Sequence, residues 1–282
     1  MKIAVLSDIH GNLTAFQTVI DHIETWGPDI TIINGDIVNR GPDSLRCWEL
    51  AAHQQAAHGW RIIRGNHEDY ILRHVGETPN PEHVGIKADI NQNSRWTHRQ
   101  VNGYVADFAA LPGGTSIIAP DGSELRTRHA SMHGNQDAFF PDTEAHIVSQ
   151  KIAPAPAVFV TSHIHVSYIR PIQSTLLVNC GSAGQHGGHD PRATYAQVTW
   201  QNGRWQAAII RLNYDMAATE RAFYESGFMD ETGPIARVVF YEWKTAVALL
   251  PMWRAHYLEL VLSQEIGLEA SVTQFLAQHG IR

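Results

Sequence analysis

The chain of 282 residues has few cysteines and no long apolar run. Its two cysteines, Cys47 and Cys180, are too few for a disulfide framework and lie in no cysteine-phosphatase loop, so we expect both to be inert. No stretch approaches the ~20 apolar residues that a membrane-spanning helix needs. The chain opens on a strand-like segment, residues 3–6, rather than on a signal-peptide pattern. We therefore expect a cytoplasmic protein with no membrane association.

Positive charge is also scarce. Lysine and arginine number 21 against 28 acidic residues, which gives a net charge of −7, and they form no basic stripe. This distribution argues against a stable nucleic-acid complex. An anionic substrate would therefore need a local positive site, which bound divalent cations can supply. Histidine, by contrast, is abundant at 17 residues, and metal binding is one reason for such abundance.

The first third of the sequence alternates strand-like and helix-like segments. Apolar runs at 2–6, 30–33 and 61–63 predict short buried strands, and helical patterns cover 13–26 and 43–58 between them. Asn12 is the expected N-cap of the first helix. Such alternation predicts a mostly parallel sheet covered by helices, with functional loops at the carboxyl ends of its strands.

The remaining two thirds change pattern twice. A polar loop around 79–85 precedes a helical stretch at 89–111. Strand-like runs follow at 115–119, 124–128, 158–161, 174–179, 194–200 and 205–212, the last two joined by the hairpin signal Gln201-Asn202-Gly203-Arg204. Helical patterns return at 215–227 and as two or three helices over 235–278. We predict one domain over residues 1–230 and a helical extension over 231–282 packed on it, with a homo-oligomer surface as its alternative role.

Three polar clusters each follow a predicted strand directly. They are Ser7-Asp8-Ile9-His10-Gly11-Asn12, Gly35-Asp36-Ile37-Val38-Asn39-Arg40-Gly41-Pro42 and Gly65-Asn66-His67-Glu68. If the strands are neighbours, the clusters meet at one edge of the sheet. A carboxylate such as Asp36 is a natural bridge between two cations, and Arg40 offers a planar fork for phosphate oxygens.

These clusters resemble the calcineurin-like metallophosphoesterase superfamily. The family pattern is Asp-x-His-Gly, Gly-Asp, Gly-Asn-His-Glu or Asp, a histidine, and Gly-His-x-His. The chain matches it in order, from residue 2 to about 212, at Asp8-Ile9-His10-Gly11, Gly35-Asp36, Gly65-Asn66-His67-Glu68 and Ser162-His163-Ile164-His165. The resemblance implies an α/β fold, the four-layer αββα sandwich of that superfamily, followed here by a C-terminal helical extension.

The resemblance also implies a centre of two metal ions. One would be held by Asp8, His10, Asp36 and His165, and the other by Asp36, Asn66, His129 and His163. The mixed oxygen and nitrogen ligands suit Mn, Fe, Zn, Co or Ni better than magnesium alone. His129 directly follows a strand-like segment and is preferred as a ligand, and its neighbour His133 remains the alternative.

Hydrolysis of a phosphate ester follows from such a centre. The two cations would share a hydroxide that attacks phosphorus in line. His67 would protonate the leaving oxygen or stabilise its charge, while Asn66 and Arg40 would hold phosphate oxygens as charge develops.

The substrate is less defined, because two segments favour different branches of the superfamily. Residues 178–184 with 190–192 resemble a segment of small phosphodiesterases, although Cys180 stands where proline is usual. Residues 38–42 look more like protein phosphatases and dinucleoside tetraphosphatases, with Asn39 in place of an aspartate. We expect a phosphodiesterase or phosphatase acting on a phosphorylated small molecule or nucleotide, with His186 and His189 as candidate substrate contacts. A symmetrical dinucleoside tetraphosphatase, a Ser/Thr protein phosphatase and, less favoured, a non-catalytic metal-binding scaffold are the alternatives.

Overall fold

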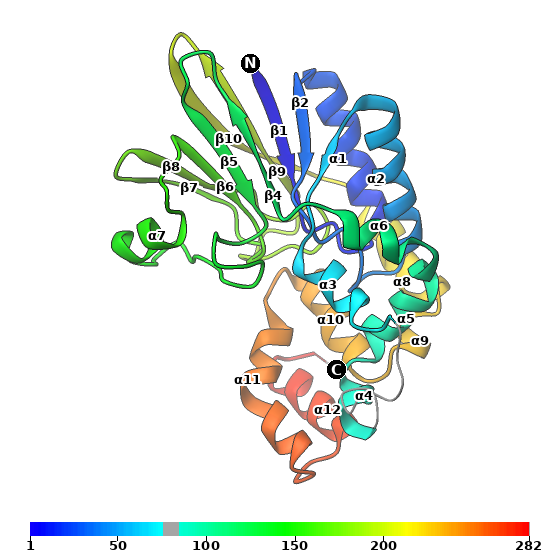
Figure 1. Ribbon diagram of the computed structural model, residues 1–282. Coiled ribbons are helices and arrows are strands. Elements are labelled where there is room, and N and C mark those ends of the chain that lie inside the picture. The colour runs from blue at the N-terminus through cyan, green and yellow to red at the C-terminus, as the bar shows by residue number, and fades with distance from the viewer. Residues whose placement is uncertain (76–84, 282) are drawn as a thin grey trace.

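The computed structural model describes residues 1–75 and 85–281, so most of the predicted loop around 79–85, with His83, lies outside the described residues. Two five-stranded sheets form the centre of the molecule (Figure 1). In spatial order, the first consists of β10 (Arg204–Leu212), β9 (Ala193–Gln201), β1 (Lys2–Leu6), β2 (Ile30–Ile33) and β3 (Arg61–Ile62). The second consists of β4 (Gly114–Ile118), β5 (Glu124–Arg128), β6 (Val158–Thr161), β8 (Thr175–Asn179) and β7 (Tyr168–Ile172).

The sheets pack face to face because their strands alternate apolar side chains between two sides. In β1, Ile3 and Val5 join a core between the sheets, to which β6 contributes Val158 and Val160. The alternate residues of β1 belong to a core shared with α1 (Leu13–Trp26), α2 (Ser44–His58) and α6 (Val105–Ala110). Phe159 of β6 instead packs toward α7 (Ala145–Lys151). The predicted four-layer αββα sandwich is thereby confirmed.

Local predictions were confirmed at the Asn12 helix cap and at the 201–204 hairpin, and they failed elsewhere. Asn12 caps α1 by accepting from the backbone N–H of Ala15 at 3.2 Å, and Asn202 and Gly203 form the hairpin turn with positive φ. Strand β7 was missed, because Pro171 interrupts its pattern; its position at a sheet edge tolerates proline.

The predicted helical stretch 89–111 is also divided in the structure. It consists of the end of α4 (Gly85–Ile90), α5 (Gln92–Val101), a 3-10 turn (Asn102–Tyr104) and α6. A further helix, α3 (Asn66–Leu72), begins inside the third motif, where no helix was predicted.

The C-terminal helices have a hydrophobic core of their own. These helices are α8 (Met216–Glu225), α9 (Phe228–Glu231), α10 (Ile235–Thr245), α11 (Leu249–Leu262) and α12 (Leu268–Gln278). Their core includes Phe223 from α8, and it also contains Ile90 from α4 and Trp96 from α5. Residues before and after the predicted boundary at residue 230 therefore share this core. The last three helices lie beneath the carboxyl ends of β1 and β2 (Figure 1). Among the described helices, none is long and apolar enough to cross a membrane.

Candidate active site

The polar motifs occupy loops that leave the carboxyl ends of strands from both sheets. Many of their residues have positive φ, which is uncommon for side chains other than glycine and clusters at functional sites. Twelve described non-glycine residues have positive φ, and seven of them belong to the motifs: Asp8, His10, Asp36, Asn39, Arg40, His163 and His165. The backbone strain of the described chain is therefore concentrated where the sequence predicts the site.

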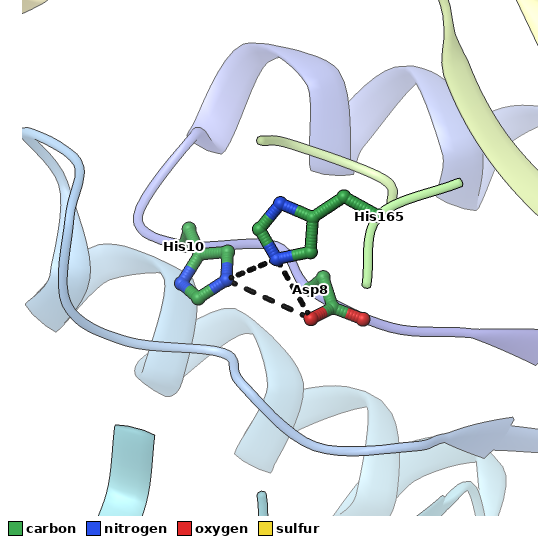
Figure 2. Close-up of side chains that lie close together, drawn as sticks. All are labelled: Asp8, His10 and His165. Carbon is green, nitrogen blue, oxygen red and sulfur yellow. Dashed lines mark hydrogen bonds and ion pairs between the residues drawn. The ribbon is translucent and has the colours of Figure 1, made fainter. Parts of the chain in front are cut away.

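One group of side chains brings together three predicted ligands of the first metal. His10 Nε2 lies 3.1 Å from His165 Nε2, and Asp8 Oδ1 lies 3.1 Å from the same atom of His165. Figure 2 shows the three side chains pointing toward a common position. Asp8 is fully buried, and its Oδ1 has no hydrogen-bond donor among the described residues. Three ligand atoms brought together in this way fit a shared cation, which would satisfy all three.

A second group lies beside the first and contains the predicted ligands of the other metal. Asp36 Oδ2 lies 3.2 Å from His129 Nε2, and Asn66 Oδ1 lies 2.9 Å from that nitrogen and 2.8 Å from His163 Nδ1. Hydrogen bonding among the protein groups alone favours the Asn66 amide with its nitrogen toward the two histidines. Only the opposite orientation, with Oδ1 toward them, allows Asn66 to hold a cation. Asp36 Oδ2 also lies 3.8 Å from His10 Nε2, so Asp36 stands between the two groups.

His129, rather than His133, lies in this second group. Its Nδ1 is 2.8 Å from the carbonyl oxygen of Asn34, which can only accept; Nδ1 therefore carries a proton and Nε2 faces Asp36. Burial lowers the pKa of His129, but the carboxylate of Asp36 outweighs burial and raises it to about 10. Such a strong attraction for positive charge suits a cation ligand. The side chain of His133 is 60% exposed and lies 3.8 Å from Asp137 instead.

Glu68 of the third motif holds the second and third motifs together through hydrogen bonds. This role was not predicted from the sequence. It is completely buried, and its carboxylate accepts from the backbone N–H groups of Gly65, Asp36 and Ile37 at 2.8–2.9 Å. The motifs approach so closely that a Cβ on Gly65 would lie 2.2 Å from Oδ1 of Asp36. Glycine is therefore required at residue 65 to bring the loops of β2 and β3 together.

His67 is oriented by Asn39. The backbone N–H of Arg40 donates to Asn39 Oδ1 at 2.9 Å, so the amide nitrogen of Asn39 must be the atom 2.9 Å from His67 Nδ1. A donor facing Nδ1 makes that nitrogen an acceptor, and the neutral ring then carries its proton on Nε2. Burial moreover holds the pKa of His67 well below its ordinary value. The His67 ring lies 4.6 Å from that of His10, adjoining the predicted metal ligands.

Four of the predicted ligands, Asp36, Asn66, His163 and His165, line a cavity of about 720 Å³. Arg40, His67 and His186 line it, whereas His189 does not. His186 is buried and its Nε2 lies 2.8 Å from the hydroxyl of Tyr214. Part of the wall comes from the C-terminal helices and contains Ile235, Val239, Glu242, Ala248, Leu250, Pro251 and Arg254. A volume of this size is typical of small-molecule sites.

Glu242 of α10 links that wall to the motifs. It is almost completely buried; Oε1 lies 3.0 Å from Arg40 Nη1 and accepts from Gln185 Nε2, and Oε2 accepts from the backbone N–H of Leu250 at 2.7 Å. The sequence analysis missed this residue. The signal was a single acidic residue on the apolar stripe of α10, seven residues after the buried Ile235.

The two cysteines take no part in the site's polar contacts. Both thiols are buried, and burial raises their pKa well above the ordinary value, so they stay protonated and unreactive at neutral pH.

The fold and the site together define a class of protein. It is a double-sheet α/β protein with clustered aspartate and histidine side chains that fit metal ions at the strand ends. A family model described as calcineurin-like phosphoesterase matches residues 1–198. The chain belongs to that family, which supports hydrolase activity and metal dependence.

Individual relatives are more distant. The chain is 34% identical over 86 residues to the asymmetrical bis(5'-nucleosyl)-tetraphosphatase PrpE of Bacillus thuringiensis subsp. konkukian, a match that covers 26% of this chain and only 34% of the relative. A metallophosphoesterase from Sphaerobacter thermophilus has a similar structure, with a TM-score of 0.65, 21% identity and coverage of 88% of this chain and 99% of that one. A hypothetical protein from Pyrococcus horikoshii also has a similar structure, with a TM-score of 0.70, 18% identity and coverage of 83% of this chain and 97% of that one. Both structural similarities concern the fold alone.

Proposed function

We propose that the protein is a dinuclear metal-dependent phosphoesterase that hydrolyses a phosphate ester of a small molecule, as a phosphodiesterase or phosphatase. The observation that carries the proposal is that the Asp8 and Asp36 groups lie side by side and contribute Asp36, His163 and His165 to the lining of a cavity of about 720 Å³. Two bound cations would supply Lewis acidity and an activated water molecule there. The distances among these side chains support the ligand set proposed from the sequence, with Asp36 as the bridge and His129 in preference to His133.

The side chains around the cations have separate proposed roles. Arg40 reaches the cavity from the second motif and would hold a phosphate oxygen, as would the amide of Asn66. His67 would direct its Nε2–H at the leaving oxygen and stabilise the charge that develops there by a hydrogen bond. The sequence allowed His67 either to protonate the leaving oxygen or to stabilise its charge. The contact with Asn39 favours stabilisation, because a neutral imidazole can donate a hydrogen bond from Nε2 but is a poor acid.

The shape of the cavity favours small substrates over proteins. Residues of α10 and α11 line the cavity together with several predicted ligands, whereas a protein phosphatase needs an open groove for its substrate segment. Tetraphosphatase activity on a dinucleoside polyphosphate is the second candidate, supported by the local similarity to PrpE and by Arg40. We also propose that the protein is cytoplasmic and that copies of it assemble through the C-terminal helices.

The direct test is hydrolysis of p-nitrophenyl phosphate, its bis ester and a panel of nucleotides by full-length protein loaded with Mn²⁺. We expect metal-dependent turnover of at least one of them. Protein that binds two equivalents of metal and turns over none of these substrates would instead favour the metal-binding scaffold. A higher rate on the bis ester would support a phosphodiesterase, and a preference for dinucleoside polyphosphates would support the second candidate.

A further inference from the structure

The cavity is positively charged beyond the predicted metal ligands, although the chain as a whole carries a net charge of −7. Three arginines line it: Arg40, Arg73 at the end of α3, and Arg254 on α11. Among the described lining residues, the carboxylates are Asp36, at the metal end, and Glu242, which is already engaged by Arg40. The three arginines of the lining therefore outnumber its two carboxylates, and neither carboxylate forms an ion pair with Arg73 or Arg254.

The positive charge of Arg254 is not balanced by a paired carboxylate. Among residues 1–75 and 85–281 it has no hydrogen bond or ion pair, while Arg40 pairs with Glu242 at 3.0 Å. The surrounding protein lowers the pKa of Arg254, and repulsion from Arg40 adds to this, with Tyr70 and Glu242 acting in the opposite direction. A guanidinium facing a cavity without a carboxylate of its own is suited to an anionic ligand.

Arg73 and Tyr70 connect this region to the reacting end. The ring of Tyr70 lies 4.9 Å from the ring of His67, and the guanidinium carbon of Arg73 lies 4.9 Å from the centre of the Tyr70 ring. Arg73 has no ion pair among the described residues either. The Tyr70 ring therefore lies between His67 and the guanidinium of Arg73, which is the second lining guanidinium without an ion pair.

We propose that Arg254 and Arg73 form an anion subsite that binds a second phosphate group of the substrate, remote from the one that is hydrolysed. The proposal rests on the proposed function and narrows it to substrates with more than one phosphate. Arg40 and the metal ligands bind the reacting phosphate, and the arginines from α3 and α11 bind the other. The C-terminal helices thus select the substrate through Arg254, in addition to covering the cavity.

The test measures binding by calorimetry to full-length protein, with free Mn²⁺ held constant. The probes are inorganic phosphate, tripolyphosphate as a continuous chain, and a hexose bisphosphate as two separate phosphates. We expect Arg254→Ala to weaken binding of at least one of the two larger probes by about tenfold or more, the loss typical of a charge-assisted hydrogen bond, and to leave inorganic phosphate unchanged. The probe that loses affinity identifies the spacing of the two phosphates.

The matched control is Arg237→Ala. Arg237 is an arginine of the same helical region, on α10, but it pairs with Glu269 and does not line the cavity. Equal affinities of Arg254→Ala and Arg237→Ala for both larger probes would overturn the subsite. Arg73→Ala is expected to give a loss of the same kind as Arg254→Ala. Because these measurements need no turnover, absence of hydrolysis by the wild-type protein would refute the proposed function while binding still decides the subsite.

Discussion

The two ends of the cavity differ in how their residues are distributed along the chain. At the metal end, the candidate residues come in short motifs, each within a few residues of a strand end, and are held in strained backbone conformations. At the helical end, Glu242 and Arg254 are single residues about 200 positions from the motif residue Arg40 that they influence. We infer that the proposed chemistry is encoded locally in this protein, whereas the proposed selection of the substrate depends on tertiary packing.

This difference implies that the two ends can be altered separately. Changes at the metal end should abolish metal binding or the chemical step for every substrate. Changes at the helical end should alter affinity for particular substrates and leave metal content intact. The following experiments test that separation.

The largest effect is expected for Asp36→Asn. Replacing the carboxylate between the two ligand groups removes the charge proposed to bridge the cations, so metal content should fall and activity should drop at least about a thousandfold. Metal content by mass spectrometry and rates with p-nitrophenyl phosphate would be measured together. Asp230→Asn, at an exposed position on α9, is the control. Full metal content and normal turnover in Asp36→Asn would rule out its bridging role.

His67→Ala should cost less than the loss of Asp36. Removal of a hydrogen bond to the leaving oxygen is expected to lower kcat by about a hundredfold or more. Metal content should remain normal, because His67 is held by Asn39 and is not among the proposed ligands. A preparation that loses metal in proportion to activity would show that His67 belongs with the ligands, as its proximity to His10 and Asp36 also permits.

A smaller effect is expected for Glu242→Ala. Arg40, Gln185 and the backbone of Leu250 would lose their shared acceptor, so Arg40 should become poorly positioned. We expect kcat/KM to fall about tenfold, mainly through KM, with metal content unchanged. Glu269→Ala, which removes an exposed glutamate paired with Arg237, is the matched control.

A double-mutant cycle decides whether Glu242 acts through Arg40. In an Arg40→Ala background, Glu242→Ala should have little further effect on KM, because the side chain that it positions is absent. Independent, additive losses would contradict the positioning role. Glu242→Gln, which keeps an acceptor oxygen, should recover part of the affinity in the wild-type background.

Much of the fold and the candidate site was accessible from sequence, for identifiable physical reasons. Short strand-like runs indicated β1 and β6, and the resemblance of the motifs to the metallophosphoesterase superfamily implied the candidate ligands. The edge strand β7 was missed because Pro171 disrupts the usual strand pattern without disrupting an edge. Glu242 and Arg254 could not be assigned, because the sequence gives no information on which helix covers the cavity. Similarly, the tautomer of His67 depends on the distant backbone N–H that orients Asn39.

The smallest effect is expected for His133→Ala, and it tests the one ligand position that the sequence left open. His133 is largely exposed, whereas His129 is buried with Nε2 3.2 Å from Asp36 and Nδ1 anchored on the Asn34 carbonyl. His133→Ala should keep both metals and lose less than about twofold in rate, because changes at exposed surface positions are usually close to neutral. His129→Ala, four residues earlier in the same loop, should lose metal. The reverse pattern in metal content would exchange the two histidines and would require the loop after β5 to rearrange when metal binds.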